Sequence, residues 1–157
     1  MIINYQLSKF LLFLLIFSSV VLFSCKKEKS GTGSKSSSYN DNSSHNVGSD
    51  CMSCHNPGGS NQYWWIVAGT VFKPDSVTLN PGSTVYLFSG PNGTGNLIFT
   101  LPVDKKSNFY TSNSVSFGTG LYPEVKSSSG EIRTMQSSIT NGNCNSCHTS
   151  SNRIIVN

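Results

Sequence analysis

The stretch "WWIVAGTVF", residues 64–72, is dominated by β-branched and aromatic residues, which pack well on the pleated surface of a strand. Downstream of it, "SVTL" (76–79) and "TVYLFSG" (84–90) alternate apolar and polar positions, as a half-buried strand does. The segment "PNGTGN" (91–96) has Asn-Gly near its centre and predicts a tight turn between strands. Residues 64–139 lack helical periodicity, so this part of the chain is predicted to be all-β.

Further short segments with strand character follow, each bounded by Gly, Pro, Asn or Ser. They lie at residues 97–103, 108–117, 121–127 and 131–137. About seven short strands at this spacing predict an antiparallel β-sandwich, flanked on both sides by a cysteine motif described below. The expected core consists of Val67, Val71, Val85, Leu87, Leu97, Phe99, Val103, Phe109, Val115, Val125 and Ile132. The terminal "RIIVN", residues 153–157, has the character of one more short strand.

The string "VAGTVFKPDSVTLNPGSTVYLFSG" (67–90), followed by "TLPVDKKSNFY" (100–110), resembles carboxypeptidase-regulatory-like, prealbumin-like sandwich modules. In that family an A-G-x-V strand precedes a V-x-L-F strand and a D-x-x-G-x-F/Y hairpin. Asp104 to Phe109 match the hairpin, with Ser107 and Asn108 where the family usually has Gly. The resemblance covers about half of the chain and implies a scaffold rather than a catalyst.

The N-terminal residues indicate export. Lys9 precedes an apolar run from Phe10 to Phe23, which has the length and flanking charge of a signal peptide over residues 1–24. The run ends at "LFSC" (22–25), which resembles a bacterial lipobox, and this resemblance implies that Cys25 becomes the lipidated first residue. The Lys-rich start "CKKEKS" is similar to that of Bacteroidetes-type lipoproteins. Lys26 favours an outer-membrane lipoprotein, facing either the periplasm or the cell surface.

Residues 25–49 are predicted to be a lipidated flexible tether, because their Ser, Gly and Asn residues offer almost no apolar surface to bury. Residues 50–157 are then the single folded domain. The net charge of +4 is modest, and no basic stripe alternates with aromatic residues. We therefore expect no nucleic-acid partner, a membrane contact through the lipid anchor, and redox partner proteins of the cell envelope.

Two near-identical motifs flank the predicted sandwich. "SDCMSCHNPGG" (49–59) and "NGNCNSCHTSS" (141–151) each contain the pentad Cys-x-x-Cys-His. Of the five cysteines in the chain, one is Cys25 and the other four are Cys51, Cys54, Cys144 and Cys147. No cysteine is left over for a structural disulfide framework, so the pentads account for all of the remaining thiols.

The pentad is the attachment motif of c-type haem. Two thiols on one short turn reach the two vinyl groups of the porphyrin and form thioethers, and the next residue places an imidazole beneath the iron. Both pentads resemble those of cytochromes c. The resemblance implies two covalent haems, with His55 and His148 as the proximal iron ligands. We expect an electron carrier rather than an enzyme.

The sixth iron ligands are less constrained by the sequence. His45 is the only remaining histidine and could fold back onto one iron, or it could be an exposed tether residue. Met135 lies nine residues before Cys144 and could ligate, or it could be an ordinary core or surface residue. An iron without a sixth ligand would be open to a small molecule. The cluster Tyr63-Trp64-Trp65 is expected to pack on a porphyrin face, to cap the sandwich or to bind sugar.

Three other interpretations of the pentads stay open. The four thiols could form a four-cysteine zinc site, two disulfides or a thiol-redox pair, although none of these uses the histidines. Our leading hypothesis is a di-haem electron-transfer lipoprotein of the cell envelope. The alternative is a non-redox surface binding module held together by zinc or disulfides. If the first and last strands share a sheet, the two pentads should meet.

Overall fold

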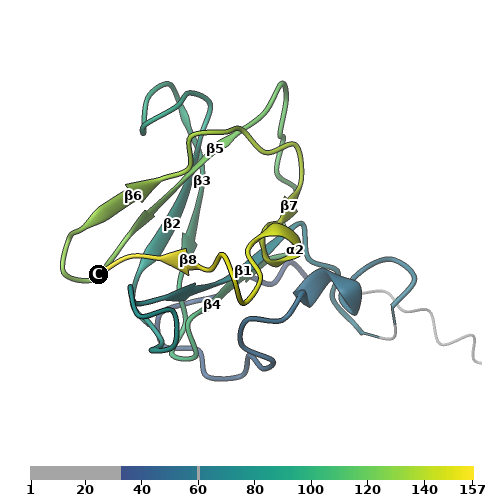
Figure 1. Cartoon of the computed structure of the whole chain (residues 1–157). Helices are drawn as coiled ribbons and strands as arrows, with labels where there is room; N and C mark the ends of the chain where they lie inside the picture. The colour runs from purple at the N-terminus through teal and green to yellow at the C-terminus, as the bar shows by residue number, and fades with distance from the viewer. Residues whose placement is uncertain (1–32, 60) are drawn as a thin grey trace, which may run out of the picture. The chain divides into compact units, whose positions relative to one another are not determined.

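The computed structural model describes residues 33–59 and 61–157 (Figure 1). The predicted signal peptide and Cys25 lie outside the described residues. The elements in chain order are η1 (Cys51–Ser53), β1 (Val67–Phe72), β2 (Thr84–Phe88), β3 (Leu97–Pro102), β4 (Asn108–Thr111), β5 (Tyr122–Lys126), β6 (Ile132–Thr134), β7 (Gly142–Asn143), α2 (Cys144–Cys147) and β8 (Ile154–Ile155). The predicted all-β class is confirmed.

The strands form two sheets. One has the order β3-β2-β5-β6 and is antiparallel throughout. The other is built around β1, with β4 antiparallel on one side and the short strands β7 and β8 parallel to β1. These two parallel pairs are the only departure from an antiparallel arrangement among the described strands. The sequence alone does not reveal them, because each involves only two residues.

Every residue of β1 is buried, which fits its position at the centre of its sheet. Val67, Val71 and Phe109 from this sheet meet Leu87 and Val125 from the other sheet in one core cluster. Most of the predicted core residues are buried or packed against this cluster. Two predictions are wrong. Leu97 and Ile132 are 51% and 49% exposed, because both begin strands that lie at the two edges of their sheet.

The turn between β3 and β4 contains the residues that match the family's hairpin motif, and it connects the two sheets. Asp104 accepts hydrogen bonds through its carboxylate from the backbone amides of Lys106 and Asn108. Ser107 occupies the turn position at φ +66°, a left-handed conformation that Gly adopts more readily. Ser107 therefore takes the turn conformation for which the family usually has Gly.

Residues 33–49 of the predicted tether are packed on the sandwich. Ser36 forms a bridge with Thr111, the Ser37 amide donates to the carbonyl of Tyr110, and the Ser112 amide donates to the carbonyl of Lys35. Residues 33–49 belong to the same compact unit as the sandwich. The folded domain therefore begins well before residue 50. This part of the tether prediction is corrected.

Polar contacts rather than apolar burial hold this segment in place. The hydroxyl of Ser37, which is buried, donates to the carbonyl of Pro102 and accepts from the amide of Tyr110. The Tyr110 hydroxyl donates to Asp41, and this hydrogen bond lowers the pKa of Asp41 to about 2. The segment covers the outer edge of β4 and satisfies groups that an open strand edge would leave unpaired. An argument from hydrophobic content overlooks such contacts.

Replacement of Ser37 by Ala should lower the free energy of unfolding by about 1–3 kcal/mol, because the buried groups bonded to its hydroxyl lose their partner. Chemical denaturation of the haem-free chain would measure the change. The matched control is Ser38→Ala at the neighbouring, exposed position, which should be close to neutral. Equal effects of the two substitutions would contradict the docked segment.

Candidate functional site

The first pentad forms a short 3-10 turn. Asp50 caps η1 through its carboxylate, which accepts hydrogen bonds from the amides of Met52 and Ser53. The His55 amide donates to the carbonyl of Cys51 at 2.9 Å. Both cysteines and the histidine of the pentad are therefore carried by a single turn.

The second pentad repeats this geometry in a slightly longer turn. Cys144 to Cys147 form α2, and the His148 amide donates to the carbonyl of Cys144, again at 2.9 Å. Each pentad thus closes the same ring, from the amide of its histidine to the carbonyl of its first cysteine. The repeated sequence folds into a repeated local structure.

Both histidines share a further feature. Nδ1 of His55 lies 2.9 Å from the carbonyl oxygen of Tyr63, and Nδ1 of His148 lies 2.8 Å from that of Asn152. A carbonyl oxygen only accepts, so each Nδ1 carries the proton. In the neutral ring Nε2 then keeps its lone pair. This is the arrangement of a metal-ligating histidine whose second nitrogen is fixed by a backbone carbonyl.

The two pentads lie next to each other on β1. β7 pairs with Val67 and Ala68, and β8 pairs with Val71 and Phe72. Between β7 and β8 the chain leaves the sheet and forms α2 (Figure 1). Gly69 of β1 allows α2 to approach the strand closely. A Cβ at this position would lie 3.0 Å from the Cβ of Cys144 and would also clash with the Phe109 ring.

Asn145 connects the second pentad to the first. Its side-chain oxygen accepts from the amide of Thr70, which β7 and β8 leave unpaired, and its nitrogen donates to the carbonyl of Ser49 at 2.8 Å. Ser49 is two residues before Cys51. Asn145 itself is only 4% exposed. The second pentad is therefore hydrogen-bonded to the segment directly before the first, so the two pentads lie close together as expected.

A cavity of about 280 Å³ lies beside the first pentad. Cys51, Cys54 and His55 line it together with His45. Trp65 is buried and stacks on the ring of His55 with centroids 4.8 Å apart. Of the predicted aromatic cluster, Trp65 and Tyr63 are thus next to the first pentad, and the Trp64 side chain is exposed.

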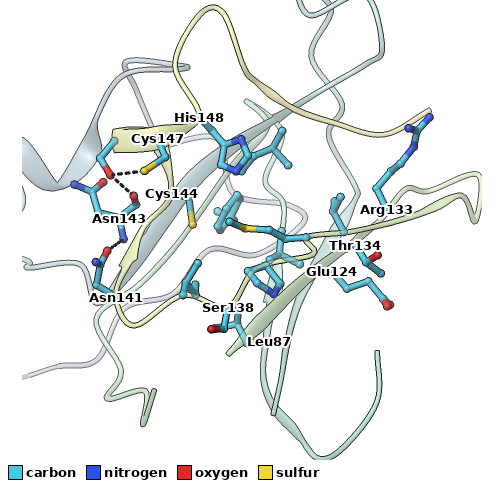
Figure 2. Close-up of a pocket in the computed structure, with 18 of the residues that line it drawn as sticks. Leu87, Glu124, Arg133, Thr134, Ser138, Asn141, Asn143, Cys144, Cys147 and His148 are labelled. Carbon is cyan, nitrogen blue, oxygen red and sulfur yellow. Dashed lines mark hydrogen bonds between the residues drawn. The ribbon is translucent and has the colours of Figure 1, made fainter. Parts of the chain in front are cut away.

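A larger cavity of about 460 Å³ lies between the second pentad and the antiparallel sheet. Figure 2 shows Cys144, Cys147 and His148 on one side of it and Leu87, Glu124 and Thr134 on the other. Met135 also lines this cavity, together with apolar residues of both sheets. The lining residues that the sequence does not assign to a site include Val85, Leu87, Val125, Ile139, Ile154 and Ile155. They were predicted only as core or strand residues, if at all.

All four pentad cysteines are free thiols. Burial raises the pKa of Cys51 to about 11, and burial raises that of Cys144 to about 12 with the nearby Cys51 adding to the shift. A thiol-redox pair depends on a lowered thiol pKa, so these two environments disfavour that interpretation. Within residues 33–59 and 61–157, no three His, Cys, Asp or Glu side chains converge to hold a metal ion.

Comparisons of the chain with protein-family models, with curated proteins and with solved structures found no match. The resemblances to sandwich modules and to cytochromes c therefore rest on the motifs themselves. In the part of the chain that the structure describes, no helix has the length and apolarity needed to span a membrane.

In the haem-free chain we predict that alkylation at pH 8 modifies Cys54 and Cys147 before Cys51 and Cys144. The first two thiols are exposed, whereas the raised pKa of the other two keeps them protonated, and the thiolate is the reacting form. Mass spectrometry of peptides at increasing reaction times would measure the order. In denaturant the difference should vanish. Equal rates in the folded chain would contradict the site geometry.

Replacement of Asn145 by Ala should destabilise the contact between the pentads, because the buried amide of Thr70 loses its acceptor. We expect a loss of about 1–3 kcal/mol and faster hydrogen exchange at Thr70, measured by mass spectrometry. The control is Ser146→Ala, since Ser146 is exposed and bonds only within its own turn. Unchanged exchange at Thr70 in the Asn145 variant would contradict the assigned contact.

Proposed function

We propose that this protein is a di-haem c-type cytochrome that transfers electrons at the cell envelope. The observation that carries the proposal is the shared geometry of the pentads. Each pentad lines a cavity of its own with two thiols and a histidine, and Nδ1 of that histidine is hydrogen-bonded to a backbone carbonyl. One haem would be attached through Cys51 and Cys54, and the other through Cys144 and Cys147. His55 and His148 would be the proximal ligands.

The residues at both positions fit this cofactor. The thiols are unpaired and lie one helical turn apart, next to the imidazole that follows them. The cavity at the second pentad falls within the size range of cofactor pockets, roughly 300–1,000 Å³, and that at the first pentad is close to its lower limit. When bound, haem supplies an iron that takes up and releases one electron.

The surrounding residues have defined tasks in this proposal. The carbonyls of Tyr63 and Asn152 fix the tautomer of each histidine and strengthen its Nε2 as a donor. Trp65 stacks on the ring of His55 and limits its rotation. All six residues of β1 are buried in the sandwich, and we expect this packing to keep the pentads in their relative position when the charge on either site changes. A fixed environment of this kind suits electron transfer, which requires little rearrangement.

The location and partners are part of the same proposal. The lipobox-like segment at Cys25 supports an outer-membrane lipoprotein, facing the periplasm or the cell surface. Electrons would be exchanged with redox partner proteins of the envelope. The sequence shows no acid–base pair suited to catalysis, so we propose a carrier rather than an enzyme. Small-molecule chemistry would require an iron that lacks a sixth ligand.

The alternative is a non-redox surface binding module with a four-cysteine zinc site or disulfides. A shared zinc ion would need the four thiols to converge, and the thiols instead line two cavities, each with a histidine whose Nε2 is available. The haem proposal uses both histidines. The alternative uses neither.

The test is production of the exported chain together with haem-attachment machinery. We expect a red protein whose mass exceeds that of the polypeptide by two haems and whose haem stain survives a denaturing gel. Replacement of Cys51 and Cys54 by Ala should remove one haem, and replacement of Cys144 and Cys147 should remove the other. The expected loss is half of the Soret absorption in each case.

A control variant, Cys25→Ala, should abolish lipid attachment and leave both haems in place. A colourless product that contains stoichiometric zinc would replace the proposal by the binding-module alternative. If the product carries a single haem, and substitutions in one pentad leave that haem in place, the proposed function is restricted to the other pentad.

A further inference from the structure

We propose that the two irons have different second axial ligands, His45 at the first pentad and Met135 at the second, and that the second site therefore has the higher reduction potential. This inference rests on the proposed function, because it concerns the same two haem sites. It adds a direction to electron flow within the protein.

His45 lies close to the histidine of the first pentad. Its ring centroid is 5.8 Å from that of His55, and the two planes are inclined by 36°. Two imidazoles on opposite sides of one metal have ring centres about 6 Å apart, since each metal–nitrogen bond is about 2 Å and each ring centre lies about 1 Å beyond its nitrogen. Both side chains line the same cavity as Cys51 and Cys54.

The docked N-terminal segment holds His45 in this position. The Asn108 side chain donates to the carbonyl of His45 and to the hydroxyl of Ser44. Asn108 is buried in β4, and its oxygen accepts from the hydroxyl of Thr70. The same Thr70 hydroxyl accepts from the amide of Gly48 on the other side of His45. A segment expected to be a free tether thus brings its one histidine to the first site.

Met135 reaches the second cavity from the opposite side. It follows β6, and its amide donates to the carbonyl of Pro123 in β5 at 2.9 Å. The antiparallel sheet therefore carries Met135, while the sheet of β1 leads into the turn that carries Cys144 and His148. Met135 is half-buried and lines the cavity with both of them. The chain has three methionines, and Met52 packs against the cluster of Trp65, Ala68 and Tyr110 instead.

The difference in ligands sets the order of the two potentials. A histidine–methionine pair of ligands raises the reduction potential of haem relative to two histidines. The charged residues that line the second cavity are Glu124, Arg133 and Arg153, and Arg133 is paired with Glu131 at 2.8 Å. Lys35 and Asp50 line the first cavity. Neither cavity has an excess of unpaired charge, so the expected difference in potential rests on the ligands.

The test is a spectroelectrochemical titration of the matured di-haem protein. We expect two one-electron waves. His45→Ala should convert only the low-potential haem to a high-spin form, and added imidazole should restore its low-spin spectrum. Met135→His should lower only the high-potential wave and bring the two waves together. Ile132→Ala, at an exposed position of the strand that leads to Met135, is the matched control and should shift neither wave.

The unaltered protein provides a test that does not depend on the folding of variants. Magnetic circular dichroism in the near infrared should show one histidine–methionine and one bis-histidine low-spin haem. Two haems with the same type of ligation would overturn the inference, and so would a variant that shifts the wave of the other site. In both cases the presence of two covalent haems would still support the proposed function. A product without covalent haem would overturn both.

Discussion

The arrangement of the molecule depends on the pairing of one edge of β1. β7 covers the beginning of this edge and β8 covers its end, and neither reaches Thr70. Asn145 supplies the missing partner, because its side-chain oxygen accepts from the Thr70 amide. A buried amide without an acceptor would cost about 1–3 kcal/mol, so the sheet requires α2 to stay at this position. The second pentad is thereby fixed against the central strand of the sandwich.

The same constraint brings the first pentad into place. Asn145 also donates to the carbonyl of Ser49, and Thr70 bonds the amide of Gly48 through its hydroxyl. One buried polar cluster therefore connects β1, α2 and the segment that precedes Cys51. In such a cluster each member satisfies another, and loss of any one leaves buried groups unpaired. Two motifs that are ninety residues apart in the chain become neighbours through these few side chains.

The N-terminal segment illustrates where reasoning from composition fails. Residues 33–49 contain too little apolar surface to predict folding, yet they are held along β4 by Ser37 and Asp41, which accept hydrogen bonds from the amide and the hydroxyl of Tyr110. Such contacts depend on the position of an exposed strand edge, which composition does not contain. The same limitation explains Leu97 and Ile132. Their apolar character predicts burial, but they lie in edge strands and remain exposed.

The all-β class, most of the buried core and the two pentads follow from the sequence, because strand alternation and the Cys-x-x-Cys-His spacing are local patterns. The proximity of the pentads, the bond of each histidine to a carbonyl, and the approach of His45 and Met135 to separate cavities depend on the tertiary structure. These features join residues far apart in the chain or in loops without periodicity, and only the packing of the two sheets decides which of them meet.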